Sequence, residues 1–139
     1  MIPPTEHAGD HDQSVAVLVV DDQAPFRLAA KSVVSLTPGF RVAGEARSGE
    51  EAVERVSELH PQLVLMDINM DGIGGIEATR RITALDRHIL VVLLSTYQQE
   101  DLPADARSCG AVAYVHKELF GPDELQGVWA AGPGATLAG

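Results

Sequence analysis

Cysteine and cationic residues are scarce in this 139-residue chain, and each shortage excludes a class of protein. The single cysteine, Cys109, cannot form an internal disulfide, which is typical of a reducing cytoplasm. Ten Lys and Arg residues against twenty Asp and Glu residues give a net charge of −10, which disfavours direct binding to nucleic acid or to an anionic membrane. No apolar run approaches the length of a membrane span. We therefore expect a cytoplasmic protein whose partners are metal cations or basic protein surfaces.

The two ends of the chain differ in composition from its middle. Residues 1–13 combine prolines with scattered charged residues and offer nothing to bury, so we expect a disordered lead-in. Residues 131–139 are rich in Gly and Ala and predict a flexible tail or the start of a linker. Residues 14–130 are long enough to bury a core of their own and predict a single domain.

Short apolar runs and helical patterns alternate along residues 14–130. Five such runs predict strands, at Val15–Val20, Arg41–Ala46, Leu63–Met66, Val91–Leu94 and Ala111–Val115. A helical pattern follows each run, and the fourth helix is predicted from the spacing of Leu102, Ala106 and Cys109. This alternation predicts an α/β protein with a flavodoxin-like, doubly wound, five-stranded parallel sheet and five helices. We expect the strand order 2-1-3-4-5, because right-handed crossovers then place helices on both faces.

Carboxylates follow two of these strands, Asp21 and Asp22 after the first and Asp67 after the third. In the expected order these strands are neighbours, and ligands bind at the carboxyl ends of parallel strands. Clustered carboxylates attract a cation, and oxygen ligands without thiols favour Mg²⁺ or Mn²⁺. Taken alone, Asp21 and Asp22 could equally favour the start of the next helix.

A hydroxyl and an ammonium group follow the last two strands. Ser95 comes directly after the fourth strand, and Lys117 lies just beyond the fifth. With a metal bound, a carboxylate can attack phosphorus while a cation and a hydroxyl bind the phosphoryl oxygens. Alone, Ser95 could merely cap a helix and Lys117 could be solvated. The set as a whole predicts a site for phosphoryl chemistry.

From Val15 to Trp129 the chain resembles the receiver domain of response regulators in two-component signalling. The resemblance rests on Asp21-Asp22, on Asp67 within Leu-Met-Asp-Ile-Asn-Met, and on Ser95, Tyr114 and Lys117 at matching strand ends. The segment Asp-Gly-Ile-Gly-Gly-Ile-Glu-Ala-Thr-Arg-Arg-Ile after Met70 is similar to receivers that precede helix-turn-helix output domains.

The resemblance implies a phosphorylation-dependent switch rather than an enzyme, apart from phosphoryl transfer to itself and autodephosphorylation. Asp67 would accept a phosphoryl group from a sensor histidine kinase. Mg²⁺ would be held by Asp22, by Asp67 and by the backbone carbonyl of Asn69, and Asp21 would act through a metal-bound water.

The resemblance also implies how such a switch responds. Ser95 and Lys117 would bind phosphoryl oxygens, and Tyr114 would swing inward as Ser95 moves. The output domain or partner protein would contact the face made by the predicted fourth helix, fifth strand and fifth helix. Dimerisation through these two helices is compatible with the pattern.

Three positions depart from the usual receiver pattern. Asp71 stands where proline is usual, and Glu118 follows Lys117, so a cis peptide bond cannot be assumed there. Thr96 stands where a very small residue is usual, and we expect it, with Asn69, to tune the rate of phosphoryl loss. Its β-branched side chain would hinder the attacking water and slow autodephosphorylation.

Two other functions remain as alternatives. A pseudo-receiver would bind its partner without phosphorylation, which Asp71 and Thr96 leave open. An aspartate-nucleophile phosphohydrolase needs an acid two residues after its nucleophile, and here Asn69 follows Asp67 at that spacing. Gln23 likewise follows Asp21 at that spacing, so the hydrolase motif fails at both positions.

Overall fold

A single parallel sheet organises residues 14–132, which are the residues described by the computed structural model of this chain. Its strands are β1 (Val15–Val20), β2 (Phe40–Ala46), β3 (Leu63–Asp67), β4 (Leu90–Ser95) and β5 (Ala113–His116). Every neighbouring pair is parallel, and the order is β2-β1-β3-β4-β5. The predicted flavodoxin-like topology is therefore confirmed.

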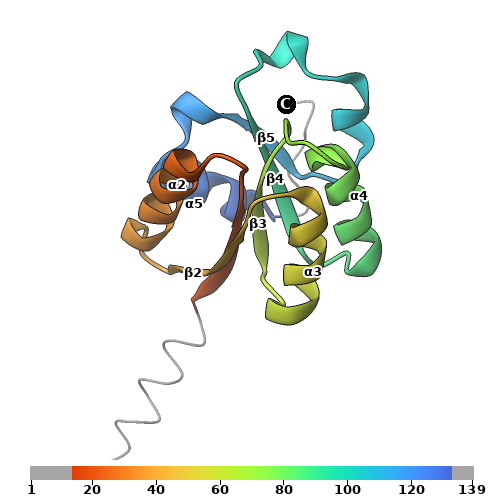
Figure 1. The fold of residues 1–139 in the computed structure, drawn as a ribbon. Helices are drawn as coiled ribbons and strands as arrows, with labels where there is room; N and C mark the ends of the chain where they lie inside the picture. Colours follow the sequence, from red (N-terminus) through yellow and green to blue (C-terminus); the bar gives the residue numbers. More distant parts are fainter. Residues whose placement is uncertain (1–13, 133–139) are drawn as a thin grey trace, which may run out of the picture.

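Four α-helices cover the sheet, two on each face (Figure 1). Helices α2 (Ala24–Leu36) and α5 (Pro122–Ala131) contact each other on one face, and α3 (Gly49–Leu59) and α4 (Gly74–Leu85) contact each other on the opposite face. Strands β1, β3 and β4 are buried along their whole length, which explains their continuously apolar sequences. Alternate residues supply the two apolar layers, so that Val17 and Val19 pack towards α2 while Leu18 and Val20 pack towards α3.

The helix starts follow local signals in the sequence. Pro25 lies in the first turn of α2, where a missing N–H leaves no partner unsatisfied. The hydroxyl of Ser48 accepts a hydrogen bond from the Glu51 amide at 3.0 Å and caps α3. The Glu51 carboxylate accepts from the Arg47 amide at 2.7 Å, which makes this a variant of the capping box.

The predicted fourth helix is wrong. Two 3-10 segments occupy the connection between β4 and β5 instead, η1 (Gln99–Asp101) and η2 (Ala104–Ser108). Pro103 lies between them, and a proline inside a helix removes a backbone donor and clashes with the preceding turn. The apolar spacing did indicate burial correctly, since Ala106 and Cys109 are both buried. The described residues therefore contain four α-helices rather than five.

Smaller boundaries also differ from expectation. Strand β5 begins at Ala113, two residues later than predicted, and runs to His116. Helix α5 ends at Ala131, and the predictions for residues 1–13 and for the tail beyond 132 lie outside the described residues. No peptide bond between residues 14 and 132 is cis, so Lys117 and Glu118 are joined in trans. Within the same residues no helix is long and apolar enough to span a bilayer.

Candidate functional site

The strand register brings the predicted site residues to one edge of the sheet. Val20 pairs with Met66, so Asp21 lies beside Asp67. Asp67 pairs with Leu94, and Ser95 pairs with His116, the residue before Lys117. Residues far apart in sequence therefore meet at the carboxyl ends of β1, β3, β4 and β5, as the topology predicts.

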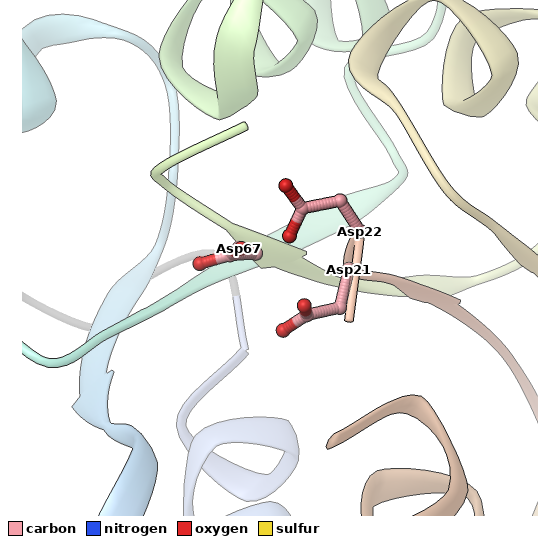
Figure 2. A group of neighbouring side chains, drawn as sticks. All are labelled: Asp21, Asp22 and Asp67. Atoms are coloured by element: carbon pink, nitrogen blue, oxygen red, sulfur yellow. The ribbon is translucent and has the colours of Figure 1, made fainter. Parts of the chain in front are cut away.

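Three carboxylates form the centre of this edge. Asp21, Asp22 and Asp67 each offer an oxygen within 4.8 Å of the others, and their side chains extend from the ends of β1 and β3 (Figure 2). Asp21 and Asp67 are buried, whereas Asp22 is exposed. An all-oxygen set with one open side could hold a hard divalent cation that keeps several waters. The donor set therefore fits Mg²⁺.

The ammonium group of Lys117 neutralises part of this charge. Its Nζ lies 2.7 Å from Asp21 Oδ2 and 3.2 Å from Asp67 Oδ1, and its side chain is only 14% exposed. Burial alone would lower the pKa of Lys117, but the carboxylates of Asp21 and Asp67 outweigh it and raise that pKa above its ordinary value. Lys117 therefore stays charged.

Asp67 is poorly stabilised as an anion in the absence of metal. Burial is the largest effect and the neighbouring charge of Asp21 the next, and together they raise the pKa of Asp67 to about 6. Lys117 opposes both effects without cancelling them. A carboxylate in this state gains from any further cation that enters the site.

Asp21 is held by hydrogen bonds from Gln23, which precedes α2, and from Arg27 within α2. The Gln23 amide donates to Asp21 Oδ1 at 2.8 Å, and Arg27 Nη1 donates to the Asp21 carbonyl at 2.8 Å. Arg27 Nε also pairs with Glu45 at 2.9 Å, which ties the first turn of α2 to β2. The Asp21 carboxylate therefore cannot turn away from Lys117 without breaking its hydrogen bond from the Gln23 amide.

The β3–α4 loop and the start of α4 approach the end of β3 closely because Gly75, in the first turn of α4, has no side chain. A Cβ atom at Gly75 would overlap the carbonyl oxygen of Asp67. Glu50 at the start of α3 holds the same loop, since its carboxylate accepts a hydrogen bond from the Ile73 amide at 3.2 Å. An open hollow of about 320 Å³ beside Asp22 is lined by Asn69, a candidate metal ligand, and by Asp71, one of the departures from the receiver pattern.

Ser95 is buried at the end of β4 and accepts a hydrogen bond from the Tyr97 amide at 3.2 Å. The Tyr97 hydroxyl in turn donates to Asn69 Oδ1 at 3.3 Å. Tyr97 thus links the loop after β4 to the loop after β3. The sequence contained no signal for this contact, because it depends on how two loops meet.

His116 connects the two loops on either side of β5. Its Nδ1 accepts from the Glu118 amide at 3.1 Å, so its Nε2 carries the proton and donates to the Thr96 carbonyl at 3.1 Å. Thr96 itself is exposed. The sequence offered no partner for His116, and the structure supplies two.

Tyr114 lies on β5 with its ring half-buried. Its hydroxyl oxygen is buried without a hydrogen-bond partner, and Arg107 lies 5.5 Å from the ring centroid. Burial raises the pKa of the Tyr114 hydroxyl, so this group remains protonated. Tyr114 and Ser95 line the same groove of about 510 Å³.

A family model identifies the family to which this chain belongs. The model for the response regulator receiver domain matches residues 17–128, which include every strand end described above. The chain belongs to this family. It is a receiver domain of two-component systems, a signalling module rather than a classical enzyme.

Full-length relatives and solved structures agree with this family. The chain is 38% identical over 103 residues to the response regulator GacA of Pseudomonas viridiflava, covering 74% of this chain and 48% of GacA. It is 32% identical over 109 residues to the transcriptional regulatory protein DegU of Brevibacillus brevis, covering 78% of this chain and 46% of DegU. This receiver therefore spans about half the length of these relatives.

Among solved structures, a LuxR-family two-component response regulator from Aurantimonas has a TM-score of 0.78 to this receiver. The two are 30% identical over 89% of this chain and 88% of that one. The response regulator domain of Thermotoga maritima CheB has a TM-score of 0.73 and is 32% identical over 85% of this chain and 96% of its own. Both support the same five-stranded fold.

Proposed function

We propose that this receiver domain is a phosphorylation-dependent switch in which Asp67 accepts a phosphoryl group from a sensor histidine kinase. The supporting observation is the buried ammonium of Lys117 between Asp21 and Asp67, beside the exposed Asp22. That arrangement provides a nucleophile, a place for a metal and a fixed positive charge at one point. The receiver would act in the cytoplasm, where Cys109 stays reduced.

Mg²⁺, or Mn²⁺ in its place, would be held by Asp22 and Asp67 directly, by the carbonyl of Asn69, and by Asp21 through a water. When bound it would neutralise charge on the phosphoryl oxygens, as divalent cations do in phosphoryl transfer. Asp22 is suited to a direct role because it is exposed and free to adjust. Asp21 is fixed by its bond from Gln23 and by Lys117, which suits a role through water.

In the transfer step, a carboxylate oxygen of Asp67 would bond to phosphorus as the bond from phosphorus to the kinase's histidine nitrogen breaks. The departing imidazole keeps that electron pair and takes a proton from water. Lys117 would turn from Asp67 to a phosphoryl oxygen, a short movement since its Nζ is already 3.2 Å from Asp67. Ser95 would donate its hydroxyl proton to another oxygen and release the Tyr97 amide.

Loss of the phosphoryl group would be slow in this receiver. In autodephosphorylation a water attacks phosphorus, phosphate leaves and the Asp67 carboxylate is restored. Thr96 is exposed next to Ser95, and the Tyr97 hydroxyl donates to Asn69 Oδ1, so both loops would place a side chain near the path of an attacking water. These side chains support the role we expected for Asn69 and Thr96 in setting the rate.

The output surface would be the groove beside β5. The chain between β4 and β5 forms 3-10 turns rather than a helix, and Ser95, Tyr114 and Leu119 line the resulting groove of about 510 Å³. Leu119 is 67% exposed, and Glu118 and Glu124 add negative charge. An output domain or a partner protein with apolar and basic side chains would fit it, and Tyr114 would transmit the movement of Ser95. A second copy of this receiver could also occupy the groove. The molecular mass of the receiver in solution tests this dimer.

A small-molecule phosphodonor tests this function without the kinase. The receiver is incubated with acetyl phosphate and Mg²⁺, and its intact mass is followed with time. A single stable addition that is absent in Asp67→Asn supports the switch. No addition would instead support a pseudo-receiver, and continuous release of phosphate from many phosphoesters would support a hydrolase.

A further inference from the structure

The aromatic ring of Phe26 lies beneath the charge of Lys117. The Nζ atom of Lys117 is 4.6 Å from the centroid of the Phe26 ring, within the range of a cation–π contact. Phe26 is half-buried and packs against the apolar cluster between the sheet and α2. The Phe26 ring therefore contacts the apolar cluster and also the ammonium group of Lys117.

The ring is held on the same turn as the acidic site. The Phe26 amide donates to the Gln23 carbonyl at 3.1 Å, and the Gln23 amide donates to Asp21 Oδ1 at 2.8 Å. Pro25 restricts the backbone directly before Phe26. Ring and carboxylate thus share one rigid turn, so the ring keeps its place if the carboxylate changes partner.

We propose that Phe26 is a positioning residue, which keeps Lys117 directed into the site when Asp21 and Asp67 take other partners. This inference rests on the proposed function, because that function requires the two carboxylates to serve a divalent cation.

Lys117 and a divalent cation would compete for the same carboxylate oxygens. Lys117 is held by two carboxylates, at 2.7 and 3.2 Å, and these are two of the three groups that fit a metal. A divalent cation there would weaken both ion pairs and repel the ammonium. A phenyl ring is not a ligand for a hard cation, so its attraction for Lys117 does not diminish when the carboxylates are occupied.

Fluorinated phenylalanines at position 26 separate this role from simple packing. One to three ring fluorines weaken the attraction for a cation stepwise while the ring stays nearly the same size. The matched control is the same series at Phe40, whose ring packs edge-to-face against Trp129 at 6.4 Å and makes no contact with Lys117 in the structure. Phe26→Leu gives the limit in which the aromatic face is removed.

The readout is the labelling of lysine by an amine-directed acylating reagent, followed by mass spectrometry. The chain has two lysines, so Lys31 is an internal reference in every sample. With Mg²⁺ present, the ratio of Lys117 to Lys31 labelling is expected to rise stepwise along the Phe26 series and by about five- to tenfold in Phe26→Leu. The Phe40 series is expected to leave the ratio unchanged.

The rate of phosphorylation by acetyl phosphate at saturating Mg²⁺ is expected to fall in the same order. A labelling ratio that stays within twofold along the Phe26 series, or that follows ring size but not fluorination, would overturn the proposal. If the wild-type receiver takes up no phosphoryl group, the proposed function fails, but the labelling ratio still decides the role of Phe26.

Discussion

Lys117 lies closer to Asp21 than to Asp67, with Nζ–Oδ distances of 2.7 and 3.2 Å. The shorter pair goes to the carboxylate that the proposed function gives only an indirect role. The longer pair leaves Asp67, the proposed phosphoacceptor, incompletely neutralised, and its pKa is raised to about 6 chiefly by burial and then by Asp21. Lys117 therefore only partly neutralises the negative charge of Asp67.

The raised pKa of Asp67 predicts how the free energy of unfolding depends on pH when no metal is added. The pKa of Asp67 is about 6 in the folded protein against 3.8 ordinarily, so the folded state binds more protons between these values. Protonation of Asp67 therefore stabilises the folded protein fully below about pH 4. This contribution, up to about 3 kcal/mol, is lost as the pH rises through about 6. Asp67→Asn should remove this loss and leave the protein about 1–3 kcal/mol more stable than wild type at pH 7. Urea unfolding at several pH values measures the difference, and the exposed Asp101→Asn is the control.

Lys117→Gln should destabilise the protein, whereas Asp67→Asn should stabilise it. Without the ammonium, Asp21 and Asp67 face each other unpaired, and the pKa of Asp67 should rise above its value of about 6. We expect a loss of about 3 kcal/mol at pH 8 and less at pH 5, where Asp67 takes up a proton. Carboxyl-carbon NMR and urea unfolding check both effects. Lys31→Gln removes an ammonium that pairs with Glu45 instead. It should change neither the pKa of Asp67 nor the rate of phosphorylation.

Gly75→Ala should disrupt the site through the backbone. The new Cβ atom would overlap the Asp67 carbonyl, so β3 or α4 must shift, and we expect about 3 kcal/mol of destabilisation or more. Gly127→Ala is a matched control, since a Cβ there meets no atom within 4 Å and lies inside α5. That control should stabilise the protein by about 0.5–1 kcal/mol. Equal stabilities of the two variants would refute the close approach of α4 to Asp67.

Thr96→Ala should speed the loss of the phosphoryl group. Removing the β-branched side chain opens the path of the attacking water, and about 1 kcal/mol off the barrier corresponds to roughly fivefold in rate. Release of phosphate from purified phosphorylated receiver measures this rate. Thr83→Ala, on α4, serves as the control. An unchanged rate in Thr96→Ala would show that this side chain does not hinder water.

Much of the site could be predicted because its residues come directly after buried strands. Asp21, Asp67 and Ser95 each end a continuous apolar run, and parallel strands with short connections leave few topologies to consider. The order of strands then brings Asp21 and Asp67 together without any knowledge of side-chain packing. The fourth helix was mispredicted because apolar spacing reports burial, while Pro103 determines the backbone.

Contacts between elements could not be predicted from local pattern. Phe26 meets Lys117 because the first turn of α2 lies beside the segment that follows β5, and the pattern within either segment does not specify that contact. Tyr97 meets Asn69, and His116 meets Thr96, because two loops have a particular conformation. No periodicity or spacing in the sequence carries that information.

The most direct test of this account is the chemical identity of the phosphorylated residue. The receiver is treated with acetyl phosphate and Mg²⁺, reduced with borohydride, which converts an aspartyl phosphate to homoserine, and sequenced by tandem mass spectrometry. We predict homoserine at position 67 alone, dependent on Mg²⁺ and strongly reduced in Lys117→Gln. Homoserine at Asp21 or Asp22, or none at any position, would contradict the account.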